Sequence, residues 1–155
     1  MVISFESIPV KIKGLMVHRP IIPVHLLHRK DRDFLIAQSL WVDSGADFTL
    51  ISHTIAEQLE LELSETTAPV GSIGQDYRVR GATCGIILAR GAEAYRLTIP
   101  VHVADNFEPR YPLFGRVGVF DRFDVVFRQR NGRVEFHNKD PSLKRINLPE
   151  KLRPR

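Results

Sequence analysis

One acidic residue, Asp43, lies between two apolar segments of the chain. Leu40–Val42 is typical of the end of a buried strand, and Phe48–Ile51 is typical of the start of a second buried segment. Carboxylates are rarely buried unless another group pairs with them. Small residues follow the acid in the sequence Asp43-Ser44-Gly45-Ala46. This order predicts a tight turn in which backbone amides hold the carboxylate and the glycine lets another chain approach closely.

Two further segments accompany this motif along the chain. Ser72–Arg80 (SIGQDYRVR) predicts a hairpin with its turn around Gly74. Leu113–Arg116 (LFGR) places two apolar residues before a Gly-Arg pair. The three segments, in this order, resemble the retropepsin family, the single-domain aspartic proteases of retroviruses and their bacterial relatives. The similarity spans residues 8–127.

The resemblance implies that Asp43 is the catalytic residue and that Ser44, Gly45 and Ala46 form the active-site loop. The chain has one such motif in 155 residues, so it is too short for two catalytic lobes. We therefore expect the second carboxylate to come from Asp43 of a second copy, across the two-fold axis of a homodimer. One carboxylate would activate water as a base while the other acts as an acid. This is an aspartic endopeptidase mechanism without a metal or other cofactor.

The resemblance also implies a set of substrate-binding residues. The acid at the position of Asp47 pairs, in the family pattern, with the arginine of the Gly-Arg segment, here Arg116, while its backbone amide faces the substrate. Such an ion pair would tie the active-site loop to the segment that follows the last apolar strand. Ile73, Gly74 and Gln75 are expected at the tip of a flap hairpin that closes over an extended peptide or protein substrate.

The rest of the chain predicts many short strands and little helix. Alternating and apolar runs indicate strands at residues 8–12, 22–27, 34–42, 84–89, 95–99, 100–103 and 133–136. Ser52–Leu59 predicts a short helix with Ser52 as its N-cap, and a second short helix is expected between Gly115 and a strand that ends at Phe127. The expected fold class is mostly β, a small closed β-barrel of the retropepsin type with a flap hairpin and one or two short helices.

The composition is that of one globular domain, with 43% hydrophobic and 26% charged residues. We expect residues 1–140 to form the protease domain and residues 141–155 to form a basic C-terminal tail. No apolar run is long enough to span a membrane, and the first residues lack the features of a signal peptide. Cys84 is the only cysteine, which indicates no disulfide and a reducing, cytoplasmic location.

Other functions use some of the same observations. A catalytically silent module of the same fold would dimerise and bind peptides without cutting them, but the intact triplet Asp43, Ser44 and Gly45 favours an enzyme. The net charge of +4 would suit nucleic acid, but the basic residues are interleaved with acids and lack an aromatic stripe, so no nucleic-acid partner is expected. His25 and His28 would face opposite sides of a strand and do not predict a metal site.

Overall fold

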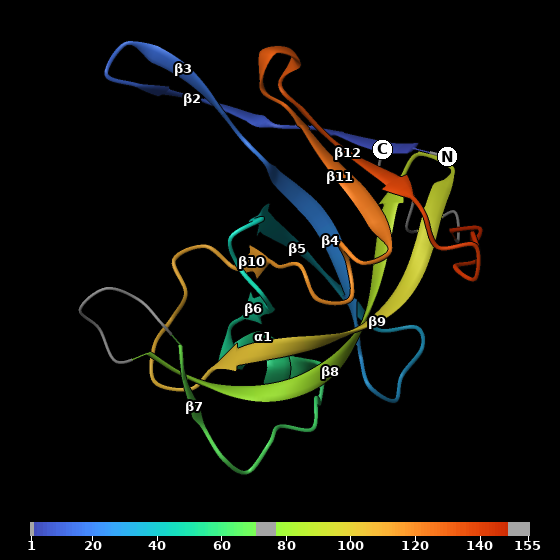
Figure 1. Ribbon diagram of the computed structural model, residues 1–155. Coiled ribbons are helices and arrows are strands. Elements are labelled where there is room, and N and C mark those ends of the chain that lie inside the picture. Colours follow the sequence, from blue (N-terminus) through green and yellow to red (C-terminus); the bar gives the residue numbers. More distant parts are fainter. Residues whose placement is uncertain (1, 71–76, 149–155) are drawn as a thin grey trace.

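The computed structural model describes residues 2–70 and 77–148 of the chain (Figure 1). The structure is mostly β. Its elements, in chain order, are β1 (Val2–Glu6), β2 (Ile8–Ile12), β3 (Leu15–Arg19), β4 (Ile21–Leu27), β5 (Leu35–Val42), β6 (Thr49–Ile51), α1 (His53–Gln58), β7 (Ala68–Val70), β8 (Tyr77–Arg90), β9 (Glu93–Ala104), β10 (Leu113–Phe114), β11 (Phe123–Arg128), the 3₁₀ helix η1 (Gln129–Asn131) and β12 (Arg133–Asn138).

The largest sheet encloses the hydrophobic core. Its strand order is β4-β5-β10-β6-β9-β8-β7, and β4 also pairs with β8, so the sheet curls back toward its own first strand. β8 and β9 form a long antiparallel ribbon, while β6 and β10 each make a parallel pair, with β9 and β5 respectively. Fully buried side chains from four of these strands meet in the core, among them Ile22, Leu40, Ile86 and Ile99.

A second, three-stranded sheet joins the two ends of the described chain in the order β1-β12-β11. Both pairings are antiparallel, with Val2 opposite His137 and Phe123 opposite Asn138. Phe136 makes edge-to-face contacts with Phe5 and Phe123, at centroid distances of 5.9 and 6.0 Å. Two further ring contacts fasten this sheet to the main core, because Phe136 lies 6.1 Å from Phe114 of β10 and Phe123 lies 5.7 Å from Tyr95 of β9.

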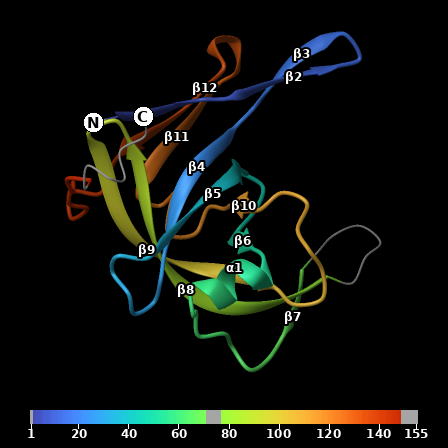
Figure 2. The same cartoon turned by 180° about the vertical axis from the view of Figure 1, so that it is seen from behind.

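β2 and β3 form a hairpin that projects from the body of the molecule, and we call residues 8–19 the arm (Figures 1 and 2). Its turn consists of Lys13 and Gly14, with φ of 47° and 80°. Two successive positive φ angles are the signature of the type I′ turn, whose twist matches that of paired strands. The arm makes no sheet pairing with the rest of the described chain.

The two predicted helices have different outcomes. Ser52 caps α1 as predicted, because its Oγ accepts a hydrogen bond from the Ile55 N–H at 3.2 Å. The helix expected after Gly115 is wrong, since residues 116–122 form consecutive turns. Gly118 has a φ of 82°, a left-handed conformation through which a right-handed helix cannot continue. No helix in the described residues has both the length and the apolar character needed to cross a membrane.

The sequence predicted most of the strands, and the structure extends several of them. The strands expected at residues 8–12, 22–27, 34–42 and 133–136 are confirmed to within two residues. β8 and β9 are continuous and longer than predicted, and β1 and β3 were not predicted. The closed barrel stays a prediction. Within the predicted tail, Arg145 forms a bridge to Tyr95 and Leu148 is buried, while residues 149–155 lie outside the described chain.

Candidate active site

Asp43 lies immediately after β5, on a turn whose backbone is held from two sides. The Asp43 N–H donates to the carbonyl of Phe114 in β10 at 3.1 Å, and the Val42 N–H donates to the carbonyl of Pro20 at 2.8 Å. The Ala46 N–H then donates to the Asp43 carbonyl at 3.2 Å and closes the turn. The buried strand and β10 therefore determine where the acid is placed.

The Asp43 carboxylate is held by the loop that follows it. The Gly45 N–H donates to Asp43 Oδ1 at 2.8 Å. Asp43 and Ala46 are half-buried in the single chain, while Ser44 and Gly45 are exposed. A Cβ on residue 45 would lie 3.2 Å from Asp43 Oδ1, which is a tight contact. Glycine thus lets this amide approach and orient the carboxylate, as the sequence predicted for a turn of small residues.

Gly115 lies against the turn at residues 43–48, which we call the active-site loop. The distance between the two backbones leaves no room for a side chain on residue 115. A Cβ on this residue would come closer than 3.0 Å to the carbonyl carbon and oxygen of Phe48. The Gly115 N–H also donates to the buried Oγ1 of Thr49 at 3.2 Å. Gly115 is therefore required by the close approach of two backbones.

Asp47 and Arg116, the expected ion pair, are brought together in the structure. Arg116 Nη2 contacts Asp47 Oδ1. Both side chains are largely exposed, at 52% for Arg116 and 66% for Asp47, and exposed pairs contribute at most about 1 kcal/mol. Main-chain bonds join the same segments, because the Arg116 N–H donates to the Ala46 carbonyl at 2.9 Å and the Val117 N–H to the Asp47 carbonyl at 2.8 Å.

Two neighbouring hollows meet at Asp43. Both are lined by Asp43, Leu50, Val70 and Leu113. The first hollow continues over the active-site loop, and its further lining residues are Gly45, Ala46, Asp47, Phe48, Pro69 and His102. The second extends toward the loop at residues 105–112, and its further lining residues are Trp41, Tyr77, Phe107, Glu108, Pro109, Arg110 and Tyr111. An extended chain could therefore place side chains on both sides of the carboxylate.

Aromatic rings dominate the second hollow, and sequence reasoning missed them. Trp41 meets Tyr111 edge to face at a centroid distance of 5.5 Å, and Tyr77 lies 4.6 Å from Phe107. The guanidinium of Arg19 lies over the Trp41 ring at 5.3 Å. These residues come from β3, β5, β8 and the 105–112 loop, which are far apart in the sequence. Only the fold brings them together.

His102 is a second residue that the sequence analysis missed. Its ring stacks on Phe48 with centroids 4.2 Å apart, in the hollow beside Asp47. Burial lowers the pKa of His102 below its ordinary value of 6.5, while the negative charge of Asp47 opposes this change. A signal was present in the sequence, because His102 stands between Val101 and Val103 in an alternating strand and so points away from the core.

The hairpin of β7 and β8 begins beside these hollows. Val70 and Tyr77 are the paired residues nearest its turn, and both line the second hollow. The predicted flap-tip residues Ile73, Gly74 and Gln75 lie outside the described residues. The described strands thus place the root of the hairpin at the candidate site.

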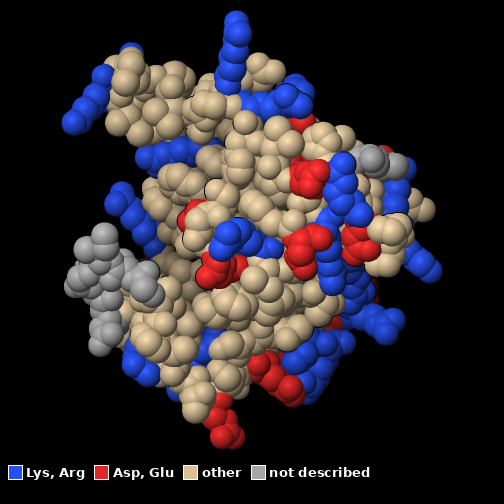
Figure 3. Space-filling view, in the orientation of Figure 1, with Lys and Arg blue, Asp and Glu red and all other residues tan. Residues whose placement is uncertain are grey.

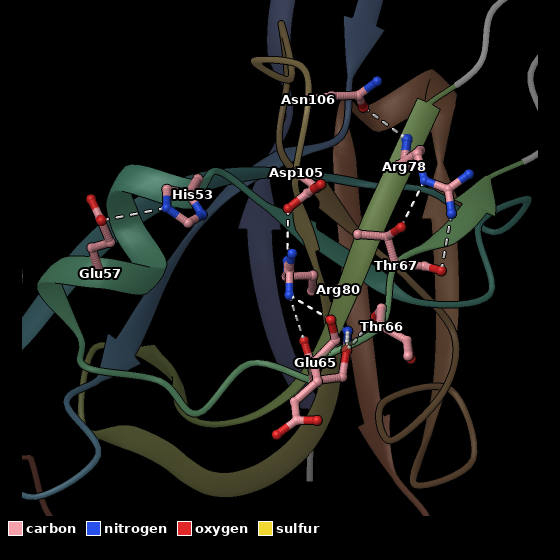
Figure 4. A network of polar contacts seen from close by, with 11 residues as sticks. His53, Glu57, Glu65, Thr66, Thr67, Arg78, Arg80, Asp105 and Asn106 are labelled. Carbon is pink, nitrogen blue, oxygen red and sulfur yellow. Dashed lines mark hydrogen bonds and ion pairs between the residues drawn. The ribbon is translucent and has the colours of Figure 1, made fainter.

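Two arginines anchor the root of this hairpin (Figure 4). Arg78 Nε donates to Thr67 Oγ1 at 2.7 Å, which joins β8 to the segment before β7. Arg80 Nε donates to Asp105 Oδ1 at 2.7 Å, and its Nη1 donates to the Glu65 carbonyl at 2.9 Å. The hairpin root is therefore fixed to both neighbouring segments by hydrogen bonds that engage charged groups.

Other reactive side chains do not form a competing site in the described residues. Burial raises the pKa of the Cys84 thiol to about 11, although a backbone hydrogen bond at Leu27 opposes this change, so the thiol stays protonated at neutral pH. His28 Nδ1 accepts backbone N–H groups from Lys30 and Asp31. Across residues 2–70 and 77–148, no cluster of three or more His, Cys, Asp or Glu side chains is placed to hold a metal ion.

The fold is similar to solved aspartic protease structures, whereas no family model and no curated protein matches the sequence. A retropepsin-like aspartic protease from Rickettsia conorii is 13% identical, with 88% of this chain and 91% of that chain covered and a TM-score of 0.52. The EIAV protease complexed with the inhibitor HBY-793 is 18% identical, with 63% and 82% covered and a TM-score of 0.44. The similarity to the Rickettsia conorii structure shows that the chain has a retropepsin-like fold.

Replacing Gly115 with alanine should destabilise the protein strongly. The added Cβ collides with the Phe48 backbone, so Gly115→Ala is expected to lower the free energy of unfolding by about 3 kcal/mol. Gly81→Ala is the matched control, because a Cβ there would meet only Ser64 Oγ at 3.9 Å. Urea unfolding of both variants measures the difference, and equal stabilities would contradict the close approach.

Removing the ion pair should cost much less. Arg116→Gln keeps the main-chain bonds to the active-site loop and loses only an exposed charge pair. We expect the free energy of unfolding to fall by less than about 1 kcal/mol, and the loss to shrink further at high salt. Urea unfolding at low and high ionic strength tests this, and a loss of several kcal/mol would show that the side chains hold the loop.

His102 should make the stability depend on pH. Because the pKa of His102 is lowered in the folded state, the unfolded chain binds more protons between that pKa and the ordinary value. Stability should therefore rise with pH through this window and fall on acidification. His102→Gln should flatten the free energy of unfolding between about pH 5 and pH 7. His25, whose pKa is also lowered by burial, accounts for a remaining slope, and an unchanged slope would contradict the assignment to His102.

Proposed function

We propose that this protein is an aspartic endopeptidase that hydrolyses peptide bonds with two Asp43 carboxylates, one from each copy of a homodimer. The observation that carries the proposal is the position of the Asp43 carboxylate. The Gly45 N–H orients it, and it lies at the junction of two hollows. The retropepsin-like fold supports the proposal, because the Rickettsia conorii protein of similar fold is an aspartic protease.

One chain does not supply the second carboxylate. The other acids that line the two hollows are Asp47 and Glu108. Asp47 is paired with Arg116, and Glu108 is an exposed residue of the 105–112 loop. Neither is held by a glycine amide as Asp43 is. A two-fold arrangement brings a second, equally oriented Asp43 to the same place, because each surface then meets its own copy.

The proposed reaction uses both carboxylates and one water molecule. Two carboxyl groups this close hold one proton between them. The ionised Asp43 takes a proton from water, and the water oxygen attacks the peptide carbonyl carbon. The protonated Asp43 donates its proton to the peptide as a tetrahedral diol forms. The first Asp43, now protonated, donates its proton to the nitrogen while the second Asp43, now ionised, takes a proton from a diol hydroxyl. The C–N bond breaks, a carboxylic acid and an amine leave, and the pair again holds one proton.

The substrate proposed is an extended peptide or protein segment with large apolar side chains. Both hollows are lined beside Asp43 by the apolar residues Leu50, Val70 and Leu113. The aromatic rings enlarge the apolar surface of the second hollow. We assign Ile73, Gly74 and Gln75 to the covering flap, and the Asp47 backbone to substrate contact. The pairing of β4 with β8 supports a closed barrel, and the single buried thiol, Cys84, supports a reducing, cytoplasmic location.

Replacing Asp43 should abolish cleavage. Asp43→Asn keeps the shape of the side chain but removes its acid–base chemistry, so cleavage of a mixed peptide library from acid to neutral pH should fall by at least about 10²–10⁴-fold. Asp121→Asn is the matched control, because Asp121 is an exposed acid in the turns after Gly115. Cleavage by wild type and Asp43→Asn alike would indicate a contaminant. A folded wild-type dimer that cuts nothing would indicate a peptide-binding module of the same fold.

Mixing the two proteins tests whether the site is shared. If both carboxylates are needed, an equal mixture of wild type and Asp43→Asn contains only about a quarter fully equipped dimers after subunits exchange. Activity per total protein should then fall to about a quarter of the wild-type value, whereas an equal mixture of wild type with the active Asp121→Asn control should keep all of it. A simple halving, with subunit exchange confirmed, would show that one chain carries the whole site.

A further inference from the structure

We propose that the arm of each chain packs against a second copy of the chain and holds the catalytic dimer together. This inference rests on the proposed function, which requires two Asp43 carboxylates to meet. It assigns the dimer contact to the β2–β3 hairpin, which contains none of the residues assigned to catalysis.

The end strands of the described chain are already paired within one copy. β1 runs antiparallel to β12 from Val2 opposite His137 to Glu6 opposite Arg133. β12 is also paired with β11 along its other edge, so both of its edges are occupied. A dimer held by exchanging these strands would have to break pairings that the single chain makes. The contact between copies is therefore better sought on another element.

The arm presents an apolar surface that its own chain leaves uncovered. Its exposed fractions are 45% for Ile8, 40% for Ile12, 71% for Leu15 and 58% for Met16. Ile12 is opposite Leu15 near the tip and Ile8 is opposite Arg19 near the root on the same face, whereas Met16 is opposite Lys11 on the other face, so exposed apolar side chains stand on both faces of the arm. Isolated exposed apolar residues are common, but several on one projecting hairpin mark an interaction surface.

The arm leaves the body beside β5, the strand that ends just before Asp43. The carbonyl of Pro20, the residue that follows the arm, accepts a hydrogen bond from the Val42 N–H at 2.8 Å, and Val42 directly precedes Asp43. The Arg19 guanidinium lies over Trp41 of the same strand. Ser7 directly precedes the first strand of the arm, β2, and its N–H donates to the Gly132 carbonyl at 2.8 Å. These contacts fix the direction in which the arm projects.

That direction leads toward the proposed partner. The arm and the 105–112 loop, which borders the second hollow, project on the same side of the body in Figures 1 and 2. A five-residue strand extends about 17 Å. If the two-fold axis passes beside Asp43, an arm that leaves the body beside Val42 and extends this far is long enough to reach the second copy. Each copy then gives one arm and receives one, as an isologous interface requires.

The size of the interface supports the same assignment. A stable interface uses about 20–30 residues from each partner. The active-site loop, residues 43–48, contributes only six residues, and the twelve residues 8–19 of the arm bring the number to eighteen, close to the lower end of this range. The arm is also basic, since residues 7–30 include no Asp or Glu, and its face in Figure 3 shows neutral and basic atoms. Because both arms carry positive charge, they would repel each other. Each arm would instead favour a surface of the partner that carries carboxylates.

The test uses a double variant of the full chain, Leu15→Ser with Met16→Ser. Both side chains are exposed, so the monomer fold should be retained, which circular dichroism checks. The dissociation constant of the dimer, measured by sedimentation equilibrium, should rise by at least about 100-fold. The matched control is Val2→Ser, which removes an exposed apolar side chain from β1 and should leave the constant unchanged. Leu15→Ser alone should give an intermediate value.

Peptide cleavage at several protein concentrations separates the two proposals. The double variant should lose activity at low concentration and recover it at high concentration, because its catalytic groups are intact. Active wild type with unchanged dimerisation of the double variant would overturn the arm proposal and leave the protease standing. Dissociation of the double variant beside a dimeric but inactive wild type would uphold the arm and overturn the protease. A wild type that is monomeric at every concentration would overturn the arm proposal.

Discussion

The contact between Gly115 and the backbone of Phe48 is the constraint on which the candidate site depends. Two main chains approach here without a side chain between them, and the hydrogen bonds that follow join residues 115–117 to residues 46–49. Phe114, one residue earlier, accepts the Asp43 N–H. A two-residue strand, β10, therefore fixes both ends of the active-site loop. The exposed Asp47–Arg116 pair adds charge to this junction but contributes little to holding it.

Around this rigid centre the site is built from parts that differ in origin. Backbone amides orient the acid, while the hollows beside it are lined by rings from distant strands and from the 105–112 loop. In the proposed enzyme, acid chemistry and peptide selection are thus separated. The turn can stay the same while the rings change, because Trp41, His102 and Tyr111 do not take part in the hydrogen bonds that hold Asp43. Variation in those rings would alter which peptide side chains fit.

Local features were predictable from the sequence, and features that depend on distant pairings were not. The turn at Asp43 and the cap at Ser52 depend on neighbouring residues, and the Asp47–Arg116 contact followed from a family pattern. The second helix failed because Gly118 adopts a left-handed conformation that the apolar pattern does not reveal. The apolar segment after the turn was also predictable, since Ile51 at its end is fully buried. The aromatic hollow could not be foreseen, because its residues meet only after the sheets form.

The pairing of β1 with β12 also has a consequence for the order of events during synthesis. Residues 2–6 are made before the rest of the described chain, but their strand partner at residues 133–138 is made more than a hundred residues later. The second sheet cannot be completed until most of the chain has been released, since such long-range pairings form late. Until β12 is made, β1 has no partner in this sheet, so a nascent chain would be unable to present a finished surface to another copy. If the proposed dimer is a protease, its cleavage of peptides would therefore begin only after translation.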